Sequence, residues 1–165
     1  MFILTGIFNS ESLGNIDFQL KGQLIEFKSQ KAISGVVIKC FSNDSLINNL
    51  YTNENGFFDI IINTKIDRLE LFYVGKLRLK ILNISLSDNE TIDLGTIPLI
   101  ESPFLLVNYE EKPSRKYLKQ RRKEKRFVMK GIIYKNKCGD EFKIKFNRKR
   151  EFYQYIDFRN LNCNA

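Results

Sequence analysis

The sequence contains no histidine, and this absence removes several kinds of active site. Histidine is the commonest general base and the commonest metal ligand in proteins. A Ser-His-Asp or Cys-His catalytic site therefore cannot be built from this chain alone. Chemistry based on carboxylates, lysine or tyrosine is left open.

Cysteine is also scarce, with only Cys40, Cys138 and Cys163 in the chain. No two of them form a CxxC pair, so we expect no zinc site, and we expect no other cofactor. An odd number gives no support for a disulfide framework. We interpret them as isolated thiols, with Cys40 buried as a small apolar residue; a Cys138–Cys163 disulfide stays open for an exported protein.

Long apolar runs are missing as well. No stretch approaches the roughly 18 apolar residues that a membrane-spanning helix needs. The segment 1–8 is apolar, but it lacks the basic residues and the small-residue cleavage site of a secretory signal. We expect residues 1–20 to form an N-terminal arm or a first strand. The alternative is that a signal has already been removed.

Isoleucine, leucine, phenylalanine and tyrosine are abundant, whereas alanine is rare. Hydrophobic residues make up 43% of the chain and aromatic residues 13%, which is enough for a packed core. β-Branched and aromatic side chains pack well on a pleated sheet, so this composition favours strands over helices.

Alternating apolar residues and regularly spaced turn signals predict six or seven strands before residue 100. The last of them should be an edge strand, because Pro98 has no N–H for a central ladder. This pattern is typical of a β-sandwich or barrel. The predicted strands are 20–27, 32–41, a short one ending near Thr52, 57–62, 67–74, 78–84 and 91–99.

The segment from Thr52 to Phe58 predicts a hairpin. Asn55 and Gly56 both tolerate positive φ, which a tight reversal needs. Thr52 is expected to hydrogen-bond the turn amides, and Phe58 to enter the core. These roles are structural and suggest no catalysis.

The order of signals in residues 21–99 resembles the carboxypeptidase regulatory-like domain, a transthyretin-like β-sandwich module. The glycine-containing first strand corresponds to 21–25, and the "pl-x-G-x-x-V" stretch to 32–38. The Thr-Asp-x-x-Gly-x-Phe element corresponds to 52–58, and the "L-x-F-x-Y-x-G" strand to 69–75. The closing "L-G-x-I-x-L" corresponds to 94–99. The sequence departs from this pattern at Asn53, where aspartate is usual, and at Lys76, where an aromatic is usual.

The resemblance implies a mainly β, seven-stranded transthyretin-like (prealbumin-like) sandwich over residues 21–101. It also implies a module that is not itself an enzyme. Such modules are common in exported and outer-membrane proteins of Bacteroidota, often fused to TonB-dependent receptors or peptidases. The resemblance therefore favours the periplasm or cell envelope, while the absence of a clear signal peptide leaves the cytoplasm open.

Positive charge is concentrated near the C-terminus. Residues 112–150 hold 17 Lys and Arg against 3 Asp and Glu, whereas the remainder holds 10 against 16, within a net charge of +8. This asymmetry predicts a basic C-terminal extension over residues 102–165. We expect a helix over 114–126 with Ser114 as N-cap, a hairpin of strands 127–134 and 141–146, and a short amphipathic helix over 151–161.

The basic segment is the main candidate for binding. Lysine and arginine in this density suit an anionic partner: an acidic protein surface, lipid head groups, a polysaccharide or nucleic acid. An acidic protein surface is favoured over nucleic acid because no RNA- or DNA-binding motif accompanies these residues. A solvated helix without a partner is the other interpretation. The candidate residues are Arg115, Lys116, Lys119, Arg121, Arg122, Lys123, Lys125, Arg126, Arg148, Lys149 and Arg150.

Acidic residues offer weaker candidates. Asp59, Asp67, Glu70 and Asp93 are scattered, although two of them could meet as a carboxylate pair. The turns 43–45 and 88–90 carry oxygen ligands of the kind that Ca²⁺ prefers, but ordinary turns explain them as well. We therefore predict a non-enzymatic β-sandwich interaction or scaffolding module at the cell envelope, with polyanion or nucleic-acid binding by 112–150 as the alternative.

Overall fold

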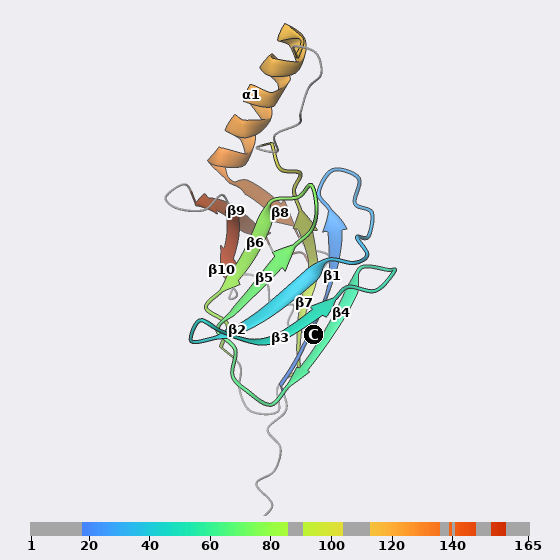
Figure 1. Cartoon of the computed structure of the whole chain (residues 1–165), viewed down its shortest axis with the longest axis vertical. Coiled ribbons are helices and arrows are strands. Elements are labelled where there is room, and N and C mark those ends of the chain that lie inside the picture. Colours follow the sequence, from blue (N-terminus) through green and yellow to red (C-terminus); the bar gives the residue numbers. More distant parts are fainter. Residues whose placement is uncertain are drawn as a thin grey trace, which may run out of the picture.

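Two β-sheets and one helix make up the described part of the chain (Figure 1). The computed structural model describes residues 18–85, 91–103, 113–135, 139, 141–147 and 153–157. The elements are β1 (Phe18–Glu26), β2 (Val37–Ser42), β3 (Ser45–Tyr51), β4 (Phe57–Ile62), β5 (Arg68–Phe72), β6 (Arg78–Leu82), β7 (Thr91–Leu99), α1 (Arg115–Lys130), β8 (Ile132–Lys135), β9 (Glu141–Asn147) and β10 (Tyr153–Asp157).

The strands form a sandwich of two unequal sheets. The smaller sheet has the order β4-β1-β7, and the larger has the order β3-β2-β5-β6-β10-β9-β8. Most neighbours are antiparallel, but β1 pairs with β7 and β6 pairs with β10 in parallel. The mainly β sandwich expected from the sequence is confirmed, with β1 to β7 in its first part and β7 at an edge as predicted.

Alternation along each strand builds the core. In β1, Leu20 and Leu24 are fully buried, and Ile38 and Leu71 reach the same core from the larger sheet. Phe58 is 4% exposed, which confirms its predicted place. Cys40 is a buried free thiol, and burial raises its pKa to about 11. Cys138 and Cys163 lie outside the described residues.

The predicted hairpin at Thr52 is instead a crossing between sheets. β3 pairs only with β2, whereas β4 pairs with β1, so the strands on either side of the turn are not partners. The turn itself is closed by the Asn53 amide donating to Phe57 O (2.9 Å) and the Gly56 amide donating to Asn53 O (2.9 Å). With Gly56 at φ 72°, this is the loop geometry that ends in a glycine bulge.

Two expectations for the C-terminal part were wrong. The helix does not end at Arg126 but continues to Lys130, so the following strand begins at Ile132. The segment predicted as a second helix contains β10, which extends the larger sheet by pairing with β6. A strand there gives the exposed edge of β6 its hydrogen-bond partners, and it buries Ile156 to 1%. The antiparallel β8–β9 hairpin is confirmed.

Thr52 supports the crossing differently from the prediction. Its hydroxyl accepts from the Val36 amide (3.0 Å) and donates to Ile33 O (2.8 Å), and the residue is 5% exposed. The turn amides of Asn55 and Phe57 donate to Asn53 Oδ1 instead, each at 3.0 Å. Asn53 therefore holds the turn, while Thr52 ties it to the preceding loop.

We expect Thr52→Val to lower the free energy of unfolding by about 2–4 kcal/mol, because valine keeps the shape but leaves two buried backbone groups unpaired. Thr52→Ser keeps the hydroxyl and loses one methyl, so it should cost only about 1 kcal/mol. Urea denaturation of the two variants measures the difference. Equal stabilities would show that these hydrogen bonds contribute little.

Candidate functional site

Helix α1 carries most of the predicted binding residues. Its N-cap is Ser114, as predicted, and the Tyr117 amide donates to Ser114 Oγ (3.2 Å). The first turn has no acidic residue, and the helix contains nine Lys and Arg but only one acid, Glu124. Like charges at i,i+4 repel, so this sequence lowers the stability of the helix on its own.

One face of α1 holds it against the sandwich. Val128 is buried, and the ring of Phe127 lies 6.3 Å from that of Phe27. Arg121 is half-buried on this inward side, where its guanidinium approaches Glu124 (3.9 Å) and donates to Ser102 O (3.5 Å). The lone acid of the helix therefore lies beside an inward-turned arginine, not among the outward cations.

The opposite face is a continuous basic surface. Arg115, Lys119, Arg122 and Arg126 follow one another at spacings of four, three and four, which places them in one line along the helix. We call the exposed cations of this side the basic face of α1; none of them has an ion pair with a residue that the structure describes. Its members are Arg115, Lys116, Lys119, Arg122, Lys123 and Arg126.

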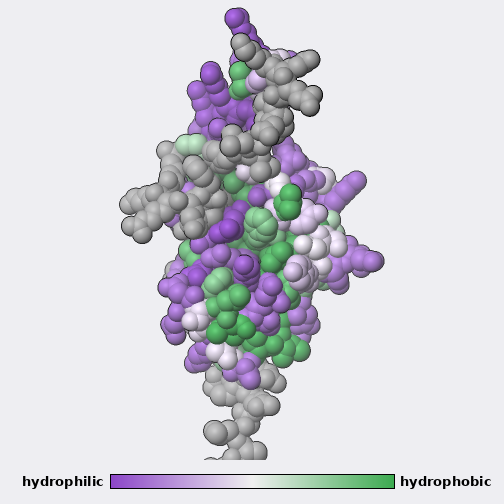
Figure 2. Space-filling model, in the orientation of Figure 1, coloured by the Kyte–Doolittle hydropathy of each residue, from purple (hydrophilic) through white to green (hydrophobic). Residues whose placement is uncertain are grey.

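The other predicted cations either do not belong to this face or lie outside the described residues. Lys125 is exposed, but it already interacts with another group, so we do not count it in the basic face. Arg148, Lys149 and Arg150 lie outside the described residues. Figure 1 shows α1 rising from one end of the sandwich, and Figure 2 shows its region as mostly hydrophilic.

Charged residues also reinforce the sandwich near the base of α1. The Lys76 ammonium donates to Glu26, and Lys28 pairs with Glu101 at 3.1 Å. Hydrogen bonds from Lys76 and from Ser29 hold the pKa of Glu26 below its usual value. These pairs are structural, because they join the end of β1 to the loop before β6 and the residues after β7.

A second positive surface lies on the outer side of the larger sheet. Glu70 is surrounded there by Lys80 (3.0 Å), Arg68 (3.3 Å) and Arg78 (3.9 Å). The Glu70 side chain is only 13% exposed, and Lys39 lies opposite it on β2. A single carboxylate therefore offsets several cations that would otherwise repel one another.

Glu70→Gln should lower the free energy of unfolding by about 1–3 kcal/mol, because it leaves this group of cations without its counter-charge. Glu101→Gln is the matched control, since it removes an exposed ion pair that is worth less than about 1 kcal/mol. Chemical denaturation at low salt compares the two. A loss for Glu70→Gln no larger than for the control would contradict this assignment.

The other acidic candidates divide between the two sheets. Asp67 accepts from the Asn43 amide (2.8 Å), and Asp44 pairs with Arg68 (2.9 Å), so turn 43–45 is held by ordinary contacts. Turn 88–90 lies outside the described residues. Among the residues described, no group of acidic or sulfur ligands has the arrangement of a metal site.

Asp59 and Asp93 lie in one row on the outer side of the smaller sheet, but on its two outer strands, with β1 between them. Lys21 on β1 is in register with both, with Asp59 on β4 and Asp93 on β7. Its ammonium lies 4.0 Å from Asp93. The scattered sequence positions gave no sign of this row, which only the strand register reveals.

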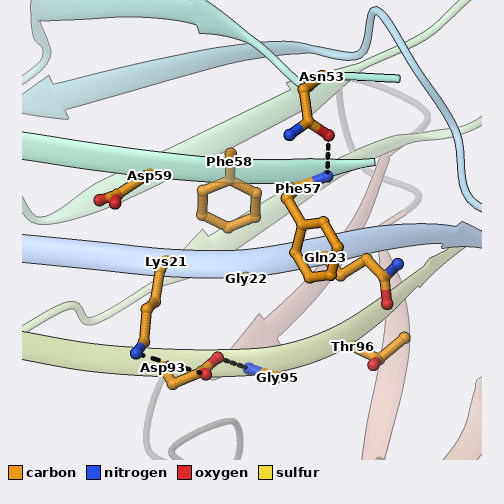
Figure 3. Close-up of a pocket in the computed structure, with 10 residues that line it drawn as sticks. All are labelled: Lys21, Gly22, Gln23, Asn53, Phe57, Phe58, Asp59, Asp93, Gly95 and Thr96. Atoms are coloured by element: carbon orange, nitrogen blue, oxygen red, sulfur yellow. Dashed lines mark hydrogen bonds and ion pairs between the residues drawn. The ribbon is translucent and has the colours of Figure 1, made fainter. Parts of the chain in front are cut away.

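These residues line an open depression that we call the sheet hollow (Figure 3). Its volume is about 530 Å³. Phe57, Gln23 and Asn53 line one end, and the row of Asp59, Lys21 and Asp93 lines the other. Sequence reasoning did not identify the hollow, because its walls come from three strands and a turn that are distant in the chain.

No protein-family model matches the chain, and no curated protein matches it. The carboxypeptidase regulatory-like resemblance therefore stays a prediction. No helix among the described residues has the length and apolar character needed to cross a bilayer.

Two solved structures from streptococcal pili are similar in part. The backbone protein of the group B streptococcus pilus 2b is 16% identical, with a TM-score of 0.33 over 50% of this chain and 40% of its own. GBS52, the minor pilin of Streptococcus agalactiae, is 17% identical, with a TM-score of 0.33 over 60% of this chain and 48% of its own. This chain thus spans less than half the length of either.

Proposed function

We propose that this chain is a non-enzymatic β-sandwich interaction module that binds an acidic protein partner through the basic face of α1. The main observation is a line of four cations along the outward side of the helix: Arg115, Lys119, Arg122 and Arg126. The single acidic residue of the helix, Glu124, lies instead beside Arg121 on the inward side. Scaffolding at the cell envelope is the setting implied by the family resemblance.

The first support for this proposal is the arrangement of positive charge on the helix. The line from Arg115 to Arg126 rises about 17 Å along the helix, so its cations present an extended positive strip. Repulsion between them disfavours the isolated helix, and an anionic surface laid along the strip relieves that repulsion. Binding and helix stability are therefore coupled, and both should respond to salt.

Exposed apolar side chains favour a protein over a nucleic acid. Leu118 is 43% exposed and Phe127 is 53% exposed, and their helical positions lie on either side of the basic strip. A phosphate backbone makes little use of an aliphatic side chain such as Leu118. An acidic amphipathic segment engages both the cations and the flanking apolar groups.

The test replaces Arg115, Lys119 and Arg122 by glutamine, which keeps helix propensity and removes three charges. The matched control replaces three exposed lysines elsewhere, Lys31, Lys39 and Lys135, by glutamine. Fluorescence anisotropy follows a labelled peptide of alternating glutamate and leucine and, separately, a labelled single-stranded DNA 20-mer. Circular dichroism verifies that both variants keep their secondary structure.

We expect the α1 variant to bind the peptide at least about ten-fold more weakly, and the control to stay within about two-fold of the original chain. Equal losses in the two variants would contradict the proposal, because they would reduce it to net charge. Tighter binding of the DNA than of the peptide would support the nucleic-acid alternative instead.

A further inference from the structure

We propose that the sheet hollow is a binding site for a neutral saccharide. The site lies on the outer side of the smaller sheet, on other elements than α1, and goes beyond the function proposed above. Its volume of about 530 Å³ is within the range of small-ligand sites and is large enough for one or two sugar rings.

A break in strand pairing forms the floor of the hollow. The register between β1 and β7 shifts between Lys21 and Gln23, so that Lys21 faces Asp93 while Gln23 faces Thr96. Gly95 lies at this shift with φ 66° and contributes no side chain. The smaller sheet therefore has a recess here, where a regular strand would place another side chain.

An aromatic ring stands beside this recess. Phe57 is 50% exposed, although its neighbour Phe58 is almost fully buried. Figure 3 shows the Phe57 ring beside Gln23 and over the side of the hollow. An exposed ring next to a polar recess offers a flat apolar face to the C–H groups of a sugar, which gives adhesion without charge.

The polar groups around the ring are already held in place. The Asp59 carboxylate accepts from Gln19 Nε2 at both oxygens (2.9 Å each), and Asp93 Oδ1 accepts from the Gly95 amide (2.8 Å). Asn53 Oδ1 is fixed by the two turn amides described above, which directs its Nδ2 donors away from the turn. Groups fixed before binding lose little entropy when a ligand arrives.

The charge balance selects a neutral ligand. Lys21 lies in register between Asp59 and Asp93, so the row holds one positive and two negative groups. A polyanion is disfavoured by the two carboxylates, and a simple cation by the ammonium between them. Hydroxyl groups, which both donate and accept, match a row that offers donors and acceptors in turn.

The experiment titrates the ¹⁵N-labelled chain with cellohexaose, maltohexaose, xylohexaose and mannohexaose, and follows amide shifts by NMR. Phe57→Ala removes the ring. Phe72→Ala is the matched control, because Phe72 is a comparably exposed aromatic (45%) on the larger sheet. A glutamate peptide serves as the anionic comparator, and the spectra themselves verify that each variant is folded.

We expect at least one glycan to shift amides of residues 21–23, 57–59 and 93–96 with a Kd of about 1–10 mM. Phe57→Ala should weaken this binding at least about ten-fold, with Phe72→Ala within about two-fold. The α1 variant should bind the glycan normally, which separates this site from the function proposed above.

Three results would overturn the proposal. The first is the absence of shifts with all four glycans at about 10 mM, a concentration at which millimolar binding is visible. The second is a set of shifts located on other elements. The third is an equal effect of the two phenylalanine substitutions. A stronger response at the hollow to the anionic peptide than to any glycan would likewise contradict a neutral ligand.

Discussion

The chain's crossing from one sheet to the other, between Thr52 and Phe57, is the constraint from which much of the sandwich follows. Gly56 O accepts from the Leu24 amide (2.8 Å), and a Cβ on Gly56 would lie 2.5 Å from Leu24 O. This close approach lays β4 against β1 in a single register, with Gly22 opposite Phe58. One phenylalanine then enters the core while Phe57 faces outward, so core and hollow are set by the same turn.

Local signals in the sequence predicted the strands of this sandwich well. In a strand that is buried on one face, apolar and polar residues alternate with period two. The pairs Leu69 and Leu71, and Leu79 and Ile81, show this period in the local sequence alone. The prediction gave Thr52 the role that Asn53 has, because the partners of Thr52 lie 16 and 19 residues away. Short-range patterns identify a turn, but they do not identify which loop a buried hydroxyl will reach.

The C-terminal part shows where such reasoning stops. β10 is a strand because β6 has an open edge, and its register, with Tyr155 opposite Lys80, joins residues 75 positions apart. Its short apolar pattern fits helix and strand equally. The basic face of α1 was predictable from helical spacing, whereas the inward turn of Arg121 was not. The row of Asp59, Lys21 and Asp93 needed the register of three strands.

The two proposed surfaces make different physical demands, and their placement keeps those demands apart. A line of cations acts over roughly a Debye length and weakens with salt, whereas stacking on Phe57 and hydrogen bonds in the hollow act only at contact. If the carboxylates of Asp59 and Asp93 lay beside the basic face, they would compete for its cations. They lie instead on the smaller sheet, balanced by Lys21. Each surface can therefore engage its ligand without neutralising the other.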